Sequence, residues 1–278
     1  MVSSAPSDPN KLHDVVDPAE HDTETSLPPA SIDAEIAAKH DRTPDSGPKR
    51  IAVVFAHPDD AEFGVAGTVA RWVKEGHTLI YISLTSGDQG GEDPNVALEA
   101  LAKIREAEQL AASEILGVSE TIFLRLPDGS ITADLKTRAL LVKTFRTIKP
   151  DVVVAMDPSF LWSDSGYINH PDHRATGQVT LDAVFPGTGN PMAYPELHAE
   201  GLPAHKIREV YLTAAKDPDV WIDITDTMDI KLRALRAHAS QLGDWDPDKE
   251  MREWGRENAK KQPGIGEYAE SFKYFKLD

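Results

Sequence analysis

Two short segments of this 278-residue chain place imidazole and carboxylate groups at close spacing. In the first, His57-Pro-Asp-Asp60, a histidine and an aspartate lie three residues apart. In the second, His170-Pro-Asp-His173, two histidines have the same spacing. Two histidines and one aspartate make a three-ligand site for a divalent metal ion, with positions left open for water and substrate. The pattern therefore predicts a catalytic metal site rather than a structural one.

Two groups in these segments remain free once three ligands are assigned. Asp59 is a spare carboxylate beside the metal site, suited to accept a proton from an attacking water molecule. One histidine of the second segment is suited to stabilise an oxyanion or to protonate a leaving amine. Either segment alone is also typical of a surface turn with a helix-capping aspartate. The presence of both, each after an apolar run, favours the metal site.

Apolar runs and amphipathic helical patterns alternate from residue 51 to residue 156. Such alternation is typical of an α/β fold, so we predict a Rossmann-like, mostly parallel sheet with helices on both faces. In such a sheet, ligands bind at the carboxyl ends of the strands, where the strand order switches. His57 follows the first predicted strand directly, and His170 follows the fourth by a short loop. We therefore expect the two segments to meet at that edge.

The predicted elements run to the end of the domain. The predicted strands are Ile51–Ala56, Thr78–Leu84, Thr121–Leu126, Val152–Met156, Glu209–Ala214 and Val220–Ile224. The predicted helices are Glu62–Glu75, Ala97–Leu116, Leu135–Ile148, His173–Phe185 and Thr227–Leu242. Residues 186–206, which are rich in proline and glycine, are expected to form a long loop over the site. Residues 244–278 are expected to pack as a C-terminal cap.

The turn after the first strand does not have the glycine-rich fingerprint of a dinucleotide site. Asp59, Asp60 and Glu62 lie where a pyrophosphate would have to bind, and their carboxylates would repel it. We therefore reject a nucleotide-binding interpretation of this strand and helix.

Composition narrows the function classes further. The net charge of −17 argues against nucleic acid or an anionic membrane surface as the main partner. The chain has no cysteine, which excludes disulfides, thiolate metal sites and cysteine nucleophiles. No apolar run is long enough to insert into a membrane, and the first residues lack the pattern of a signal peptide, so a cytoplasmic location is expected. The sequence leaves a homo-oligomer open.

Residues 1–48 differ from the rest of the chain. They are rich in acidic residues, proline and serine, and they contain no Phe, Trp or Tyr. Such a segment cannot bury enough apolar surface to offset the entropy of ordering, so we predict a disordered acidic tail. Residues 49–278 are then expected to form the catalytic domain.

Three motifs resemble those of the PIG-L/LmbE family of metal-dependent N-deacetylases. They are Ala56-His-Pro-Asp-Asp-Ala-Glu-Phe-Gly64, His170-Pro-Asp-His-Arg174 and Ala237-His-Ala-Ser-Gln241, in the family's order within residues 50–245. Arg105-Glu-Ala-Glu108 and Leu126-Pro-Asp-Gly129 also look like family features. The chain has Ala61 where many members have a glutamate, and Glu62 follows it.

The resemblance implies a Rossmann-like fold and a site for zinc, with ferrous iron as the alternative. The implied metal ligands are His57, Asp60 and His173. The resemblance further implies that Asp59 is the general base and that His170 steadies the oxyanion, with Asp172 as its partner. It also implies substrate contacts from three further residues, namely Arg105, Asp128 and His238. On spacing alone, His238 is an ordinary helix residue.

We therefore expect a zinc-dependent N-deacetylase that removes an acetyl group from a small N-acetylglucosamine-type sugar conjugate. A second interpretation is an amidase that acts on larger glucosaminyl conjugates, such as thiol S-conjugates. A third interpretation is a non-catalytic sugar-binding protein with a relict metal site. The complete ligand set, together with Asp59, argues against the third interpretation.

Overall fold

The computed structural model describes residues 47–91, 93–163 and 166–277. The predicted acidic tail, residues 1–48, lies outside these residues except for its last two. The strands are β1 (Arg50–Phe55), β2 (Thr78–Thr85), β3 (Glu120–Leu126), β4 (Val152–Met156), β5 (Glu209–Thr213), β6 (Val220–Asp223) and β7 (Ala269–Lys276). The α-helices are α2 (Asp60–Gly64), α3 (Ala66–Lys74), α4 (Leu98–Leu116), α5 (Leu135–Ile148), α6 (Pro171–Asp182), α7 (Pro195–Ala199), α8 (Met228–Leu235), α9 (Ala239–Leu242) and α10 (Asp248–Lys260). A kinked π-helical turn, η1 (Ala183–Thr188), follows α6, and a 3₁₀ turn, η2 (Thr225–Thr227), precedes α8.

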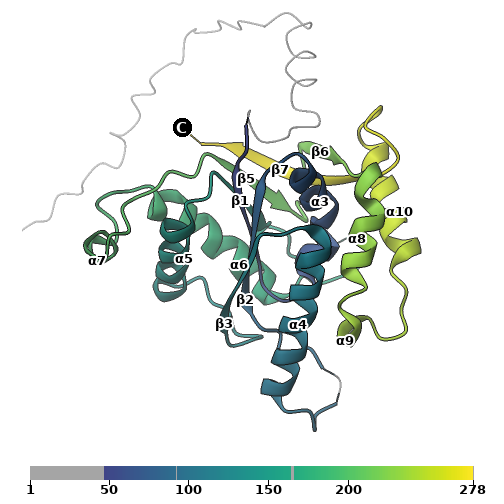
Figure 1. The fold of residues 1–278 in the computed structure, drawn as a ribbon, viewed down its shortest axis with the longest axis horizontal. Coiled ribbons are helices and arrows are strands. Elements are labelled where there is room, and N and C mark those ends of the chain that lie inside the picture. The colour runs from purple at the N-terminus through teal and green to yellow at the C-terminus, as the bar shows by residue number, and fades with distance from the viewer. Residues whose placement is uncertain (1–46, 92, 164–165, 278) are drawn as a thin grey trace, which may run out of the picture. The chain divides into compact units, whose positions relative to one another are not determined.

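The strands form one seven-stranded sheet in the order β3-β2-β1-β4-β5-β7-β6 (Figure 1). Strands β3, β2, β1, β4 and β5 pair in parallel, whereas β7 pairs antiparallel with both β5 and β6. The predicted mostly parallel α/β fold is confirmed. All six predicted strands are present, and each end lies within one residue of the prediction.

The two faces of the sheet are covered by different helices (Figure 1). Successive side chains of a strand point to opposite faces. On β1, Ala52 and Val54 pack in one core cluster with residues of α5 and α6. Ile51, Val53 and Phe55 pack in the other with residues of α3, α4 and α8. Because β1 is buried on both faces, its sequence after Arg50 is apolar throughout and does not alternate between apolar and polar residues.

The C-terminal segment corrects one expectation. Residues 244–278 do not cap the domain, because they supply α10 and β7, and β7 lies inside the sheet. Phe272 and Tyr274 of β7 contact Tyr211 of β5 through their rings, at centroid distances of 5.8 and 4.9 Å. The alternation of these aromatic residues with Ser271 and Lys273 is a strand signal that the aromatic content of the segment obscured.

The segment 186–206 also differs from the expected loop over the site. It contains α7, and it packs around the buried Arg146 of α5. The guanidinium of Arg146 donates hydrogen bonds to backbone carbonyls of this segment, among them Ala193 at 2.9 Å and Asn190 at 3.1 Å. These bonds hold the segment against α5, and none of its residues lines either of the cavities described below.

Three predicted helices have different bounds in the structure. The predicted helix 62–75 is two helices that meet at Val65, which is not helical (φ −142°, ψ 3°). The predicted helix 227–242 breaks before His238, the N-cap of α9. The helix predicted from residue 173 begins at Pro171, a residue type favoured in the first turn. No helix in the described ranges is long and apolar enough to cross a membrane.

A buried ion pair joins β7 to the helices beside it. The Nζ of Lys231 on α8 donates to Oε1 of Glu270 at 2.6 Å, and both side chains are 5% exposed. The carboxylate of Glu270 also accepts from the backbone N–H groups of Gly67 and Thr68, at 3.1 and 2.8 Å. These are free donors of the first turn of α3, so Glu270 caps that helix from another strand.

The Lys231→Met substitution should lower the free energy of unfolding by about 3–5 kcal/mol, because it leaves the carboxylate of Glu270 buried without its cation. Chemical denaturation measures this loss. Lys273→Met is the matched control, because Lys273 pairs with Asp219 at 2.9 Å and both side chains are over 30% exposed. Its loss should stay below about 1 kcal/mol. Equal losses in the two variants would contradict a structural role for the buried pair.

Candidate metal centre and active site

The strand order of the sheet switches between β1 and β4, which lie side by side. His57 follows β1 directly, and α6, which carries His173, comes after the connection that leaves β4. The ring centroid of His57 lies 4.9 Å from that of His170 and 5.3 Å from that of His173. The two sequence segments therefore meet at the carboxyl edge of the sheet, where ligands bind in folds of this type.

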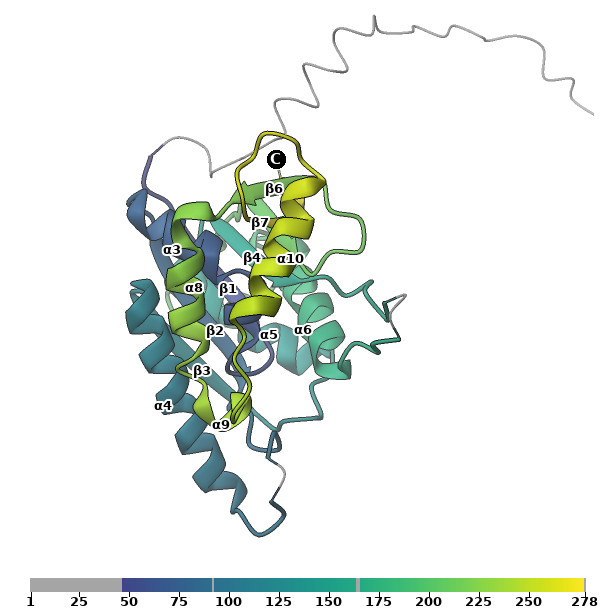
Figure 2. The same cartoon turned by 90° about the vertical axis from the view of Figure 1, so that its right-hand side faces the viewer.

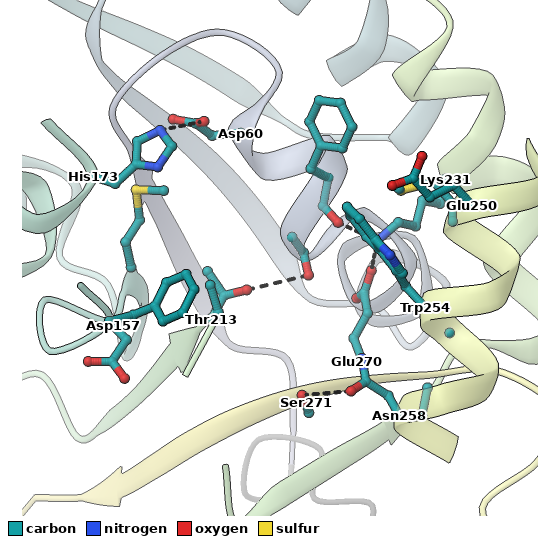
Figure 3. Close-up of a pocket in the computed structure, with 18 of the residues that line it drawn as sticks. Asp60, Asp157, His173, Thr213, Lys231, Glu250, Trp254, Asn258, Glu270 and Ser271 are labelled. Carbon is teal, nitrogen blue, oxygen red and sulfur yellow. Dashed lines mark hydrogen bonds and ion pairs between the residues drawn. The ribbon is translucent and has the colours of Figure 1, made fainter. Parts of the chain in front are cut away.

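Asp60 closes the turn that follows β1. Its Oδ2 accepts hydrogen bonds from the backbone N–H groups of Ala56 and His57, at 3.2 and 2.8 Å. Oδ2 also lies 3.5 Å from Nδ1 of His57. The other oxygen, Oδ1, lies 3.0 Å from Nε2 of His173 (Figure 3). One carboxylate therefore links both histidines across the switch point.

The donor atoms in this cluster fit a divalent metal ion. Ligand nitrogens of His57, His170 and His173 lie within 4.8 Å of one another, and Asp60 contacts two of these three residues. Imidazole nitrogen and carboxylate oxygen are donors that Zn²⁺ and Fe²⁺ accept. The structure thus brings together the three predicted ligands and adds His170 as a neighbour at ligand distance. Asn169 orients His173, because its Oδ1 lies 3.0 Å from Nδ1 of that ring.

Two further carboxylates hold the opposite side of the His57 ring. Oδ1 of Asp128 lies 2.9 Å from Nε2 of His57, and Oδ2 of Asp172 lies 3.4 Å from the same nitrogen. Such an outer carboxylate fixes the orientation of a ligand histidine and leaves its other nitrogen for the metal. Burial opposes a charge on His57, but hydrogen bonds with Asp128, Asp172 and Asp60 raise its pKa to about 12. This shift reflects a local excess of negative charge, which a bound cation would balance.

Asp59 is held in an unusual backbone conformation. Its φ is 98°, in the left-handed region, which costs a residue other than glycine about 1–3 kcal/mol. The backbone N–H of Asp59 donates to Oε1 of Gln109 at 3.1 Å, and its Oδ2 lies 3.2 Å from Nη2 of Arg105. Burial and the charge of Asp60 raise the pKa of Asp59 to about 7, although Arg105 lowers it. Asp59 therefore has the setting of a proton acceptor near neutral pH.

Arg105 lies beside Asp59 and is almost fully buried. Its guanidinium donates to the carbonyl oxygens of Gly87 and Pro58, at 2.9 and 2.6 Å, as well as to Asp59. Arg105 was predicted to contact the sugar. It does line a cavity, but these bonds direct the guanidinium towards Asp59 and the turn that carries it. The arrangement supports a positioning role for Arg105.

The predicted partnership between Asp172 and His170 takes a different form. The fully buried carboxylate of Asp172 accepts from the backbone N–H groups of Gly129 and Ile131, at 2.8 and 3.1 Å. His170 instead contacts the backbone N–H of Asp172, which donates to its Nδ1 at 3.2 Å. His170 thereby caps α6, and Asp172 fixes the turn that carries Asp128. Burial and the neighbouring histidines lower the pKa of His170.

Asp128, also predicted to contact the sugar, uses its second oxygen within the protein. Its Oδ2 accepts from the backbone N–H of Gln89 at 2.9 Å, while Oδ1 contacts His57. The side chain lines the smaller cavity but is only 5% exposed. These contacts support a role for Asp128 in orienting the ring of His57.

A buried polar chain connects His238 to Asp59. Nε2 of His238 lies 3.1 Å from Oε2 of Glu62, and Oε1 of Glu62 accepts from Nε2 of Gln109 at 3.1 Å. The side chain of His238 is fully buried and lines neither cavity, which does not fit the predicted contact with substrate. Gln109 had not been predicted as a site residue. Its position four residues after Arg105, on the same helix face, is the signal that would have identified it.

Two adjoining cavities open from the metal centre. The smaller has a volume of about 430 Å³, and its polar wall includes His57, Gln89, Arg105 and His170. The larger, about 870 Å³, extends to α10 and β7 (Figure 3). Asp59, Asp60, Tyr167 and His173 line both. The C-terminal segment thus shapes the larger cavity, whereas residues 186–206 line neither cavity.

The Arg105→Lys substitution tests the positioning role. Lysine keeps the charge but cannot make the three contacts of the guanidinium fork, so kcat should fall about 10- to 100-fold with KM nearly unchanged. Steady-state kinetics on an N-acetylglucosaminide measures both constants. Lys103→Ala on the exposed side of α4 is the control and should change neither. A raised KM at unchanged kcat would instead support the predicted sugar contact.

Comparisons with known proteins identify the family of the chain. Residues 52–184 match the family described as PIG-L: GlcNAc-PI de-N-acetylase. The chain is 34% identical over 205 residues to diacetylchitobiose deacetylase of Thermococcus kodakarensis, covering 72% of this chain and 74% of that protein. It is 30% identical over 201 residues to a probable N-acetyl-alpha-D-glucosaminyl L-malate deacetylase 2 of Bacillus anthracis, covering 70% and 82%.

The fold comparison leads to the same family. The solved structure of N,N'-diacetylchitobiose deacetylase from Pyrococcus horikoshii superposes with a TM-score of 0.75 at 30% sequence identity, covering 82% of this chain and 84% of that one. The relatives are thus similar to this chain over most of its length, and the solved structure shares its fold. This chain belongs to the PIG-L family of de-N-acetylases.

Proposed function

We propose that the protein is a zinc-dependent hydrolase that removes the acetyl group from the 2-acetamido group of an N-acetylglucosamine-type sugar conjugate. The relatives named above, which are deacetylases of sugars of this kind, support the substrate class. The observation that carries the proposal is the position of Asp59. It is a carboxylate at the wall of both cavities, beside the histidine cluster but outside the predicted ligand set.

His57, Asp60 and His173 would hold the metal ion, with His170 at its edge. A divalent cation at such a site lowers the pKa of water and polarises an amide carbonyl. Fe²⁺ is the alternative to Zn²⁺ for this donor set. Asp128 and Asn169 keep the two ligand rings in place through their other nitrogens, at 2.9 and 3.0 Å.

The remaining groups have distinct tasks in amide hydrolysis. Asp59 takes a proton from the attacking water, because a carboxylate with a pKa of about 7 is an effective base near neutral pH. His170, in the wall of the smaller cavity, faces the place where the carbonyl oxygen gains negative charge and donates a hydrogen bond to it. The proton held by Asp59 then passes to the leaving amine, which completes the cleavage into acetate and the free amino sugar.

Asp59→Asn should lower kcat by about 10²–10⁴-fold, the usual contribution of a general base, and leave the metal content unchanged. The variant keeps the shape of the side chain but cannot accept the proton. Acetate release gives kcat, and elemental analysis of the purified protein gives the metal content. Normal turnover with full metal content would remove Asp59 as the base.

His173→Ala should differ from Asp59→Asn in its metal content, because it removes a proposed metal ligand rather than the base. We expect bound metal to fall well below one ion per chain and activity to fall with it. Chelation of the unmodified protein should abolish acetate release, and Zn²⁺ or Fe²⁺ should restore it to different extents. Full activity of the chelated protein would contradict a metal-dependent mechanism.

A further inference from the structure

The larger cavity is too extensive for the reacting sugar alone. Its volume of about 870 Å³ lies near the top of the range of about 300–1,000 Å³ that binds drug-sized molecules. The smaller cavity, at about 430 Å³, has the polar wall and the catalytic groups that an acetamido sugar requires. The two share Asp59 and His173, so a molecule bound in one extends directly into the other.

Several aromatic and thioether side chains line the larger cavity away from the metal centre. Phe160 and Tyr167 stack at a centroid distance of 6.3 Å, and Trp254 projects from α10 into the same cavity (Figure 3). Trp254 is 50% exposed although it lines the cavity, so it is accessible to a ligand. Figure 2 shows α10 next to α8, on the side of the sheet where Met228 and Met251 complete this wall.

Three charged groups in this wall, namely Lys231, Glu270 and Asp157, are already paired inside the protein, whereas Glu250 adds a further exposed carboxylate. Lys231 is the only lysine or arginine among the described residues that line the larger cavity, and it donates to Glu270 and to the carbonyl of Phe63. Asp157 accepts from the backbone N–H groups of Ser159 and Lys216, at 2.8 and 2.9 Å. No cation of this wall is therefore available to a carboxylate or phosphate. Burying such an anion without a partner is costly.

We infer that this cavity receives an uncharged ring, such as a second pyranose, joined to the acetamido sugar that reacts. The inference rests on the proposed function and adds the chemical class of the aglycone. The apolar face of a sugar ring packs on the indole of Trp254, and its hydroxyl groups remain hydrated at the open side. An aglycone that carries carboxylates or phosphates would instead face apolar side chains and the carboxylates of the protein. It would find no free cation to pair with.

The test compares three substrates of the full-length, metal-loaded protein. They are N-acetylglucosamine, its disaccharide, and an N-acetylglucosaminide whose aglycone is a dicarboxylate. We expect kcat/KM for the disaccharide to exceed that for the monosaccharide at least tenfold, and the dicarboxylate to be no better than the monosaccharide. A dicarboxylate substrate that equals the disaccharide would overturn the inference and leave the deacetylase proposal standing. Absence of acetate release from all three would overturn the proposed function.

Two tryptophan variants locate the effect. Trp254→Ala should lower kcat/KM about tenfold more for the disaccharide than for the monosaccharide. Trp162→Ala is the control, because Trp162 is 66% exposed and lines neither cavity. It should leave both values unchanged. Equal losses on both sugars in Trp254→Ala would overturn the assignment.

A binding measurement separates the two proposals. Calorimetry on the Asp59→Asn protein does not depend on turnover, and the disaccharide should bind at least tenfold more tightly than the monosaccharide. Equal affinities would contradict the aglycone site whatever the reaction.

Discussion

The site depends on one carboxylate that makes contacts to three sides. Asp60 holds the turn after β1 through two backbone N–H groups, faces Nδ1 of His57, and reaches His173 on α6. The turn and α6 come from parts of the chain more than a hundred residues apart, and only the adjacency of β1 and β4 brings them within reach. The neighbouring Asp59 is left outside these contacts. The proposed division between Asp60 as a metal ligand and Asp59 as the general base therefore follows from the contacts of this turn.

Local sequence patterns were sufficient for six of the seven described strands and for the meeting of the two histidine segments. β1 and β4 are apolar throughout because both of their faces are buried, and this signal does not depend on distant contacts. The strand β7 was not identified, because its pairing with β5 and β6 is set by tertiary contacts of Phe272 and Tyr274. Similarly, the helix break before His238 follows from its buried contact with Glu62, which no helix propensity encodes.

The individual roles within the site were harder to predict than its location. Arg105, Asp128 and His238 were all expected to contact substrate, yet their hydrogen bonds lead to Asp59, His57 and Glu62 respectively. A motif specifies that a residue is required but not whether it acts on the substrate or on another side chain. That distinction needs the positions of hydrogen-bond partners, such as Gln89 and Gln109, which lie outside the motifs that mark the site.

The position of β7 between β5 and β6 has a consequence for the order in which the enzyme is assembled on the ribosome. The proposed metal ligands lie between residues 57 and 173, which are synthesised before α10 and β7. The cap of α3, the partner of Lys231 and part of the wall of the larger cavity come from β7, which follows the other described strands in the chain. A nascent chain that already contains every proposed metal ligand therefore still has an open edge at β5, and its larger cavity is complete only after β7 has been synthesised.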